Sequence, residues 1–200
     1  MLVVMADLTP SITPSAAGLR ALSHPTRLKI LMRLRVEGPA TATTLARELA
    51  LNTGATSYHL RQLAEHGFIV EDTERGDARD RWWRAAHRST RANLTDRRDD
   101  EDAESAEAYL QNVALLYTET LMQAVGERRY LPEEWQRATT TSDWHLRLSA
   151  ARAEQLVDTL ADLVEQWTEE EDDTEGVADF VVNLNAFPRP GTVVLEGTGR

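Results

Sequence analysis

The sequence contains no cysteine, so the chain can form neither a disulfide nor a thiolate metal site. It also lacks any apolar run as long as a membrane span, and residues 1–15 have no basic stretch of the kind that opens a signal peptide. These absences predict a soluble protein of the cytoplasm with no membrane partner.

Lysine is almost absent as well, because Lys29 is the only lysine among 22 cationic residues. Arginine suits bidentate contacts to phosphate and guanine, but a GC-rich genome that favours arginine codons explains the bias equally well. The net charge of -11 hides an asymmetry: residues 1–92 hold 13 Arg and Lys against 9 Asp and Glu, whereas residues 93–200 hold 9 against 24. The basic half can meet phosphates while the acidic half is held away from them.

Nothing in the sequence indicates catalysis, a cofactor or a metal. There is no Gly-rich phosphate loop, no nucleophile elbow, and no paired histidine and carboxylate with a structural reason to converge. No two of the five histidines lie at metal-ligand spacing on the long helix expected after residue 103. We therefore expect a protein that is not an enzyme, needs no cofactor and does not sense metals.

Residues 15–92 have the pattern of a small helical domain followed by a hairpin. Apolar periodicity predicts helices over 15–22, from Pro25 to the stop at Gly38, from Thr41, and from Asn52 as N-cap to the stop at Gly67. Strands are expected at 68–70 and around 82–83. The last three of these helices, followed by a two-stranded hairpin, predict a winged helix-turn-helix domain.

The helix after Asn52 has two distinct faces. Thr56, Leu60 and Leu63 form the inner face, while the outer face carries small polar groups, an aromatic ring and a guanidinium, with no acidic residue before Glu65. A face of this kind lets the backbone approach DNA closely, whereas a merely solvated helix usually mixes both charges. The residues predicted to contact DNA from this helix are Thr53, Gly54, Ser57, Tyr58, His59 and Arg61.

The hairpin is expected to act as a cationic wing. Gly76 permits the turn at its tip, and arginines nearby can lie along phosphates or enter a minor groove. Two aspartates in the same stretch weaken the patch, so a surface hairpin with local ion pairs is the alternative. The predicted contact residues of the wing are Arg75, Arg79 and Arg81.

The segments LSHPTRLKIL and TATTLARELALNTGATSYHLRQLAEHGFI, together with the wing, resemble the ArsR-like family of winged helix-turn-helix transcriptional regulators over about residues 16–88. The resemblance implies a DNA-binding regulator in which Thr53, Ser57, Tyr58 and Arg61 face the major groove. Gly54 stands where a polar residue is common and Tyr58 where histidine is frequent. The DNA sequence preferred by the family is therefore not carried over.

Residues 93–130 are predicted to form a linker and a long helix, from about Ala103 to Glu127. Its apolar residues recur at three- and four-residue steps, which is typical of a two-helix contact between subunits, with packing inside the chain as the alternative. The acidic run at 96–104 is interpreted as a solvated helix N-terminus. The predicted dimerisation residues are Leu110, Val113, Tyr117 and Leu121.

The sequence of residues 131–190 predicts a small α+β module for regulation or dimerisation. A loose tail is expected at 191–200 and a flexible N-terminus at 1–14. The module would contain a short helix, strands at 144–148 and 180–187, and a helix capped by Ser149. Trp135, Trp144 and Trp167 are expected to line a pocket for a small organic effector. Filling a small core or a subunit interface is the alternative.

Taken together, the sequence predicts a mainly α-helical protein with small β-sheets. Its expected function is that of a homodimeric, sequence-specific transcriptional regulator, a repressor, bound to an inverted repeat in double-stranded DNA. The alternative is a protein-interaction module whose winged domain no longer binds DNA and whose acidic half recruits a partner.

Overall fold

A computed structural model describes residues 9–75, 80–91, 100–167 and 176–194. The contact pattern divides the chain into two compact units, residues 1–130 and residues 131–200. In the described ranges, no helix is both long and apolar enough to cross a membrane. Each unit is considered by itself below.

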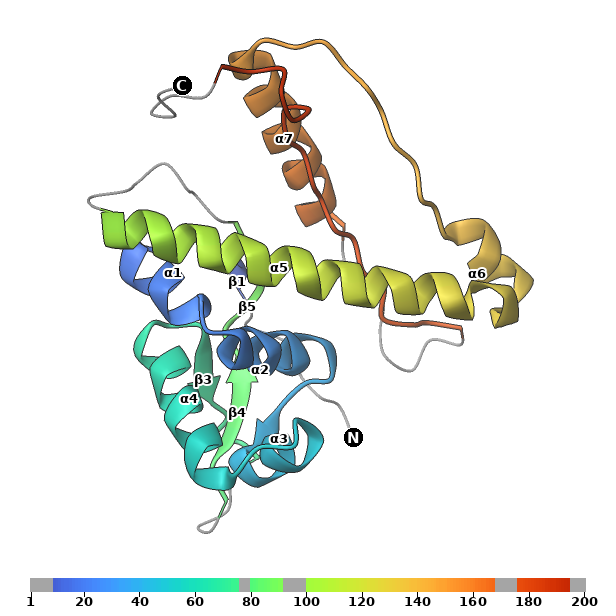
Figure 1. The fold of residues 1–200 in the computed structure, drawn as a ribbon. Coiled ribbons are helices and arrows are strands. Elements are labelled where there is room, and N and C mark those ends of the chain that lie inside the picture. Colours follow the sequence, from blue (N-terminus) through green and yellow to red (C-terminus); the bar gives the residue numbers. More distant parts are fainter. Residues whose placement is uncertain (1–8, 76–79, 92–99, 168–175, 195–200) are drawn as a thin grey trace. The chain divides into compact units, whose positions relative to one another are not determined.

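Four helices of the first unit match the sequence expectations: α1 (Ala16–Leu22), α2 (Pro25–Val36), α3 (Ala42–Glu48) and α4 (Thr53–Glu65) (Figure 1). Each begins at a side chain that accepts a hydrogen bond from an orphan amide of the first turn. The shortest of these bonds runs from the Ala55 amide to Asn52 Oδ1, at 2.7 Å. Gly67 follows the end of α4 with a φ of +74°, in the left-handed region that favours glycine.

The wing is an antiparallel sheet of β2 (Ala40–Thr41), β4 (Trp82–Ala85) and β3 (Ile69–Glu71), in that order. β4 pairs Trp83 with Ala40 on one side and with Glu71 on the other. A second, parallel pair joins β1 (Thr9–Ile12) to β5 (His87–Thr90). The expectation of a flexible N-terminus is thus wrong for residues 9–12, because β5 supplies a hydrogen-bonding partner for their backbone.

One apolar core holds these elements together. Phe68 lies at its centre with no exposed surface, packed among leucines from the four helices. Burial of this kind supplies most of the favourable free energy of folding in a small domain. The other large side chains without exposed surface are Leu22, Ile30, Leu31, Leu45, Leu60 and Leu63.

The long helix α5 (Asp100–Glu127) packs on α1 and α2 (Figure 1). Ala106 and Tyr109 are buried in the core, and Asp102, 5% exposed, forms an ion pair with Arg20 at 2.8 Å. The interpretation of the acidic run as solvated is therefore wrong at Asp102, because Arg20 of α1 pairs with its carboxylate. Residues 96–99 of that run lie outside the described ranges. Packing within the chain occupies the first half of α5.

The second unit contains α6 (Glu133–Ala138) and α7 (Ala150–Glu165), the latter capped by Ser149 as expected; the short 3-10 helix η1 (Arg128–Tyr130) ends the first unit. The strands expected at 144–148 and 180–187 are not formed, and no strand occurs in the described part of this unit. A strand exists only through hydrogen bonds to a neighbouring strand, and an alternating sequence does not supply that neighbour. The α+β expectation for this unit is wrong to that extent, while the mainly helical fold with small sheets and a long helix is confirmed.

Candidate nucleic-acid interface

The outer face of α4 is small, polar and accessible. Thr53, Gly54, Tyr58 and Arg61 are exposed, Ser57 is half-buried, and the first turn carries no acidic residue. A Cβ added at Gly54 would meet only Asn52 Oδ1, at 3.4 Å, so nothing in the fold requires a glycine there. The missing side chain instead leaves the backbone of the first turn open to a large ligand.

His59 lies on the other side of this helix. It is 8% exposed, and its ring lies 4.6 Å from the ring of His24, between α4 and the start of α2. The prediction that His59 contacts DNA is therefore wrong, because its position one step beyond Tyr58 turns it toward the core. Burial lowers the pKa of His59 below its ordinary value, and His24 and Arg27 lower it further.

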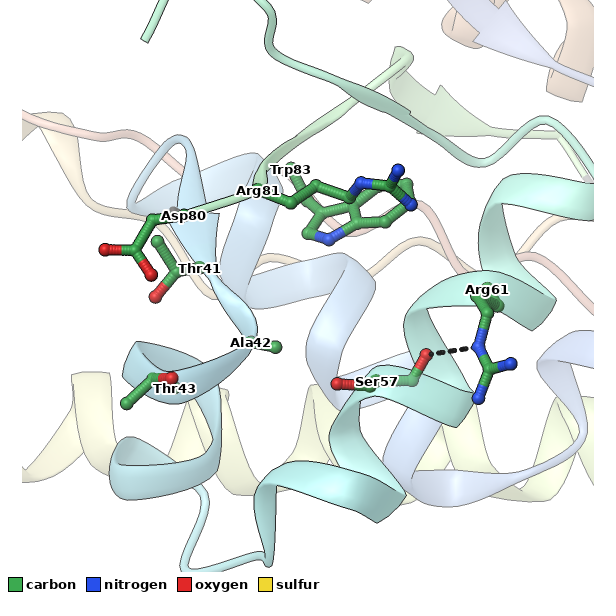
Figure 2. Close-up of a pocket in the computed structure, with 8 residues that line it drawn as sticks. All are labelled: Thr41, Ala42, Thr43, Ser57, Arg61, Asp80, Arg81 and Trp83. Carbon is green, nitrogen blue, oxygen red and sulfur yellow. Dashed lines mark hydrogen bonds between the residues drawn. The ribbon is translucent and has the colours of Figure 1, made fainter. Parts of the chain in front are cut away.

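A cavity of about 350 Å³ separates α4 from the wing (Figure 2). Arg61 enters it from α4, with Nε donating to the Ser57 carbonyl at 3.3 Å, and Arg81 enters it from the start of β4. Two guanidinium groups from separate elements, surrounded by hydroxyl groups, suit an anion such as a backbone phosphate. The remaining lining residues are Thr41, Ala42, Thr43, Ser57, Asp80 and Trp83.

The wing arginines also have partners on their own hairpin. Arg81 lies 3.1 Å from a carboxylate oxygen of Glu71 and 5.6 Å from the ring centre of Trp83, and Arg75 lies 3.6 Å from Asp72. Arg81 and Glu71 are both exposed, and such surface pairs stabilise a fold by only about 0–1 kcal/mol. A phosphate can therefore replace the carboxylate at little cost. Arg79 and Gly76 lie outside the described residues.

Sequence reasoning missed Arg27, in the first turn of α2. Its Nε is buried without a hydrogen-bond partner, burial lowers its pKa, and Tyr58 of α4 opposes that effect. A cation with an unsatisfied donor thus lies near enough to Tyr58 for the two groups to interact electrostatically. The contact joins two helices, so no local pattern in the sequence could reveal it.

The predicted dimerisation residues fall into two groups. Leu110 and Leu121 are 43% and 45% exposed on α5. Val113 and Tyr117 are half-buried instead, with Val113 packed against the core of its own chain. Only the first group leaves apolar surface for a second copy.

The three tryptophans of the second unit are not gathered in one place. Trp135 stacks on Phe180 with ring centres 6.3 Å apart, whereas Trp144 and Trp167 are 78% and 77% exposed. Rings exposed to this extent do not enclose a ligand. Elsewhere in the described ranges, no three His, Cys, Asp or Glu side chains gather as metal ligands would.

Comparison with known proteins matches residues 22–72 to the model of a helix-turn-helix domain. Residues 22–72 thus form a helix-turn-helix domain. The chain is 40% identical over 65 residues to the HTH-type transcriptional regulator YgaV of Escherichia coli K12, a match over 32% of this chain and 66% of that protein. The chain thus spans just under two thirds of that relative.

Solved structures of a ZitR variant from Lactococcus lactis are also similar. The apo form is 19% identical, covers 72% of this chain and 83% of that one, and has a TM-score of 0.33. A second structure of the variant gives 18% identity and a TM-score of 0.32. Scores this low add nothing to the assignment, which depends on the matched helix-turn-helix segment.

The pair of His24, half-buried, and His59, buried, predicts that the domain loses stability in acid. Burial lowers the pKa of both His24 and His59 from the ordinary histidine value of 6.5. As the pH falls below 6.5, these histidines therefore bind protons more readily in the unfolded chain than in the folded one. The contribution of the neutral histidines to the free energy of unfolding should therefore be complete above pH 6.5. It should be lost as the pH decreases from that value through the lowered pKa of the folded state. Urea denaturation at pH 7.5 and 5.5 measures the loss.

His59→Gln should reduce this pH dependence, since the variant removes one of the two groups. His145→Gln is the matched control, because His145 is 87% exposed and lies in the second unit. Equal pH dependence in wild type and His59→Gln would contradict the prediction.

Proposed function

We propose that this protein is a winged helix-turn-helix transcriptional regulator. It acts as a homodimer that binds a specific inverted repeat in double-stranded DNA and represses by occluding a promoter, without a metal signal. The observation that carries the proposal is the outer face of α4: exposed, free of acidic residues in its first turn, and joined to the cationic wing by the cavity that Arg61 and Arg81 share. A helix of this kind enters the major groove with its N-terminal turns against base edges. The protein would work in the cytoplasm, where DNA is accessible.

The two arginines are assigned different roles. Arg61 is placed on the helix that reads bases, where a guanidinium can bond a guanine bidentately. Arg81 immediately precedes β4 of the wing and is assigned to a backbone phosphate. The side chains of Thr53, Ser57 and Tyr58 complete the reading face.

Selection of bound duplexes from a random DNA pool tests this function directly. An inverted repeat with half-site centres about one helical turn apart is the expected result, because a two-fold axis relates the two recognition helices. Recovery of no motif would favour the alternative, a protein-interaction module that uses the acidic half of the chain.

Alanine variants separate the two arginine roles. Arg61→Ala should cost about 1–3 kcal/mol of binding free energy and relax the preferred sequence. Arg81→Ala should weaken all sequences alike and reduce the slope of log affinity against log salt by about 1. Fluorescence anisotropy with cognate and scrambled duplexes at several salt concentrations measures both, and a changed sequence preference in Arg81→Ala alone would contradict the assignment.

An organic effector at the second unit is the remaining part of the proposal. Its support is the aromatic pair of Trp135 and Phe180, whose ring centres lie 6.3 Å apart. Tryptophan fluorescence during a metabolite screen tests it. The exposure of Trp144 and Trp167 favours a subunit interface instead.

A further inference from the structure

The second unit has no hydrophobic core of its own. In its described residues, 131–167 and 176–194, no side chain is buried. Its apolar residues are nevertheless large and numerous: Phe180 is 58% exposed, Val182 56% and Leu184 43%. Folding needs the burial of such surface, so this part of the chain is incomplete as a single copy.

The exposed apolar residues follow the periods of two kinds of element. Trp144, Leu146 and Leu148 alternate with polar residues. In 178–186 the apolar residues at even positions alternate with Asp or Asn, except at Val181. On α7, Ala153, Val157 and Ala161 form a half-buried stripe at four-residue steps. The unit thus carries one amphipathic helix and two strand sequences that share no ladder, and both extended segments run without regular structure (Figure 1).

The segment 177–187, VADFVVNLNAF, is self-complementary about Val182. In an antiparallel pair of two copies centred there, Phe180 of one copy faces Leu184 of the other, and Ala178 faces Ala186. Large apolar side chains thus meet large ones, and small meet small, on one face. On the opposite face Asp179 faces Asn185, so no like charges meet across the pair.

We propose that residues 178–186 pair antiparallel with the same residues of a second copy, and that this intermolecular ladder builds the core that the second unit lacks. Trp135 already stacks on Phe180, and the apolar stripe of α7 supplies a further cover for the sheet. The 144–148 segments can extend the ladder on both sides, which gives the three or more strands that an independent sheet needs.

Self-complementarity is what identifies the partner as a second copy. An antiparallel pair with two-fold symmetry matches each residue with the position at the same distance on the other side of its centre, so the pattern around Val182 decides how well two copies fit. The match is good on the apolar face, where Phe180 meets Leu184, while on the opposite face Val181 meets Asn183. A strand from another protein would impose no such symmetry. The inference deepens the proposed homodimer and rests on that part of the proposed function alone.

Single cysteines test the register, since the chain has none of its own. At the two-fold axis the Cα atoms of both Val182 residues would lie about 4.5–5.5 Å apart, within disulfide range, whereas the two Leu184 Cα atoms would lie about 14 Å apart. Oxidised Val182→Cys should therefore migrate as a covalent dimer on a non-reducing gel. Leu184→Cys, the matched control, should remain monomeric there.

A mixture of Phe180→Cys and Leu184→Cys chains, unfolded together and refolded, should also yield a covalent heterodimer that neither variant gives alone. Equal cross-linking of Leu184→Cys and Val182→Cys, or none in either, would overturn the proposal. The assay needs no DNA, so its result is independent of whether α4 reads bases.

Discussion

A Leu110→Asp, Leu121→Asp variant is expected to lose about 10²–10⁴-fold in affinity for the two-half-site operator, because linked half-sites lose their effective concentration when the subunits separate. Both leucines lie on one face of α5, are 43% and 45% exposed, and are not needed by the core of their own chain. Aspartate side chains at these two positions would repel those of the second subunit across the contact. Sedimentation and binding to one- and two-half-site duplexes measure the effect.

Leu115→Asp is the matched control, since Leu115 is 69% exposed on a different face of the same helix. It should bind the operator as wild type does. If the double variant also binds as wild type does, the interface does not involve this part of α5. The cross-linking pattern at Val182 then reports whether the second unit alone holds the dimer.

Phe68→Ala is expected to cost about 3–5 kcal/mol of unfolding free energy, from lost apolar burial and the cavity left behind. Phe68 is fully buried, and a Cβ added to Gly18 of α1 would lie 3.3 Å from its Cζ, so the ring fills the space against that helix closely. Such a loss is a large share of the about 5–15 kcal/mol that stabilises a typical domain. Urea denaturation followed by circular dichroism measures it.

Val70→Ala provides the comparison, because Val70 lies in the neighbouring strand β3 but is 37% exposed. It should cost about 1 kcal/mol or less, since little apolar surface is lost. Similar losses in the two variants would mean that the core is not organised around Phe68.

The helical part of the first unit could be predicted from the sequence because its signals are local. Caps such as Asn52 and the stop at Gly67 act within a few residues, and so does the apolar period that buries Leu60 and Leu63. The outer face of α4 followed from the same period. His59 was misplaced although it lies three residues after Thr56 and four before Leu63, which is the spacing of the inner face.

Features that join distant parts of the chain depended on the tertiary structure. The pairing of β1 with β5, the ion pair of Asp102 with Arg20, and the electrostatic interaction of Arg27 with Tyr58 all involve groups that meet only after folding. The alternating segments at 144–148 and 180–187 show the same limit from the other side. Their sequence determines that they can form strands with one apolar face, but a strand also needs a hydrogen-bonding neighbour, and which chain supplies it is decided by the assembled structure.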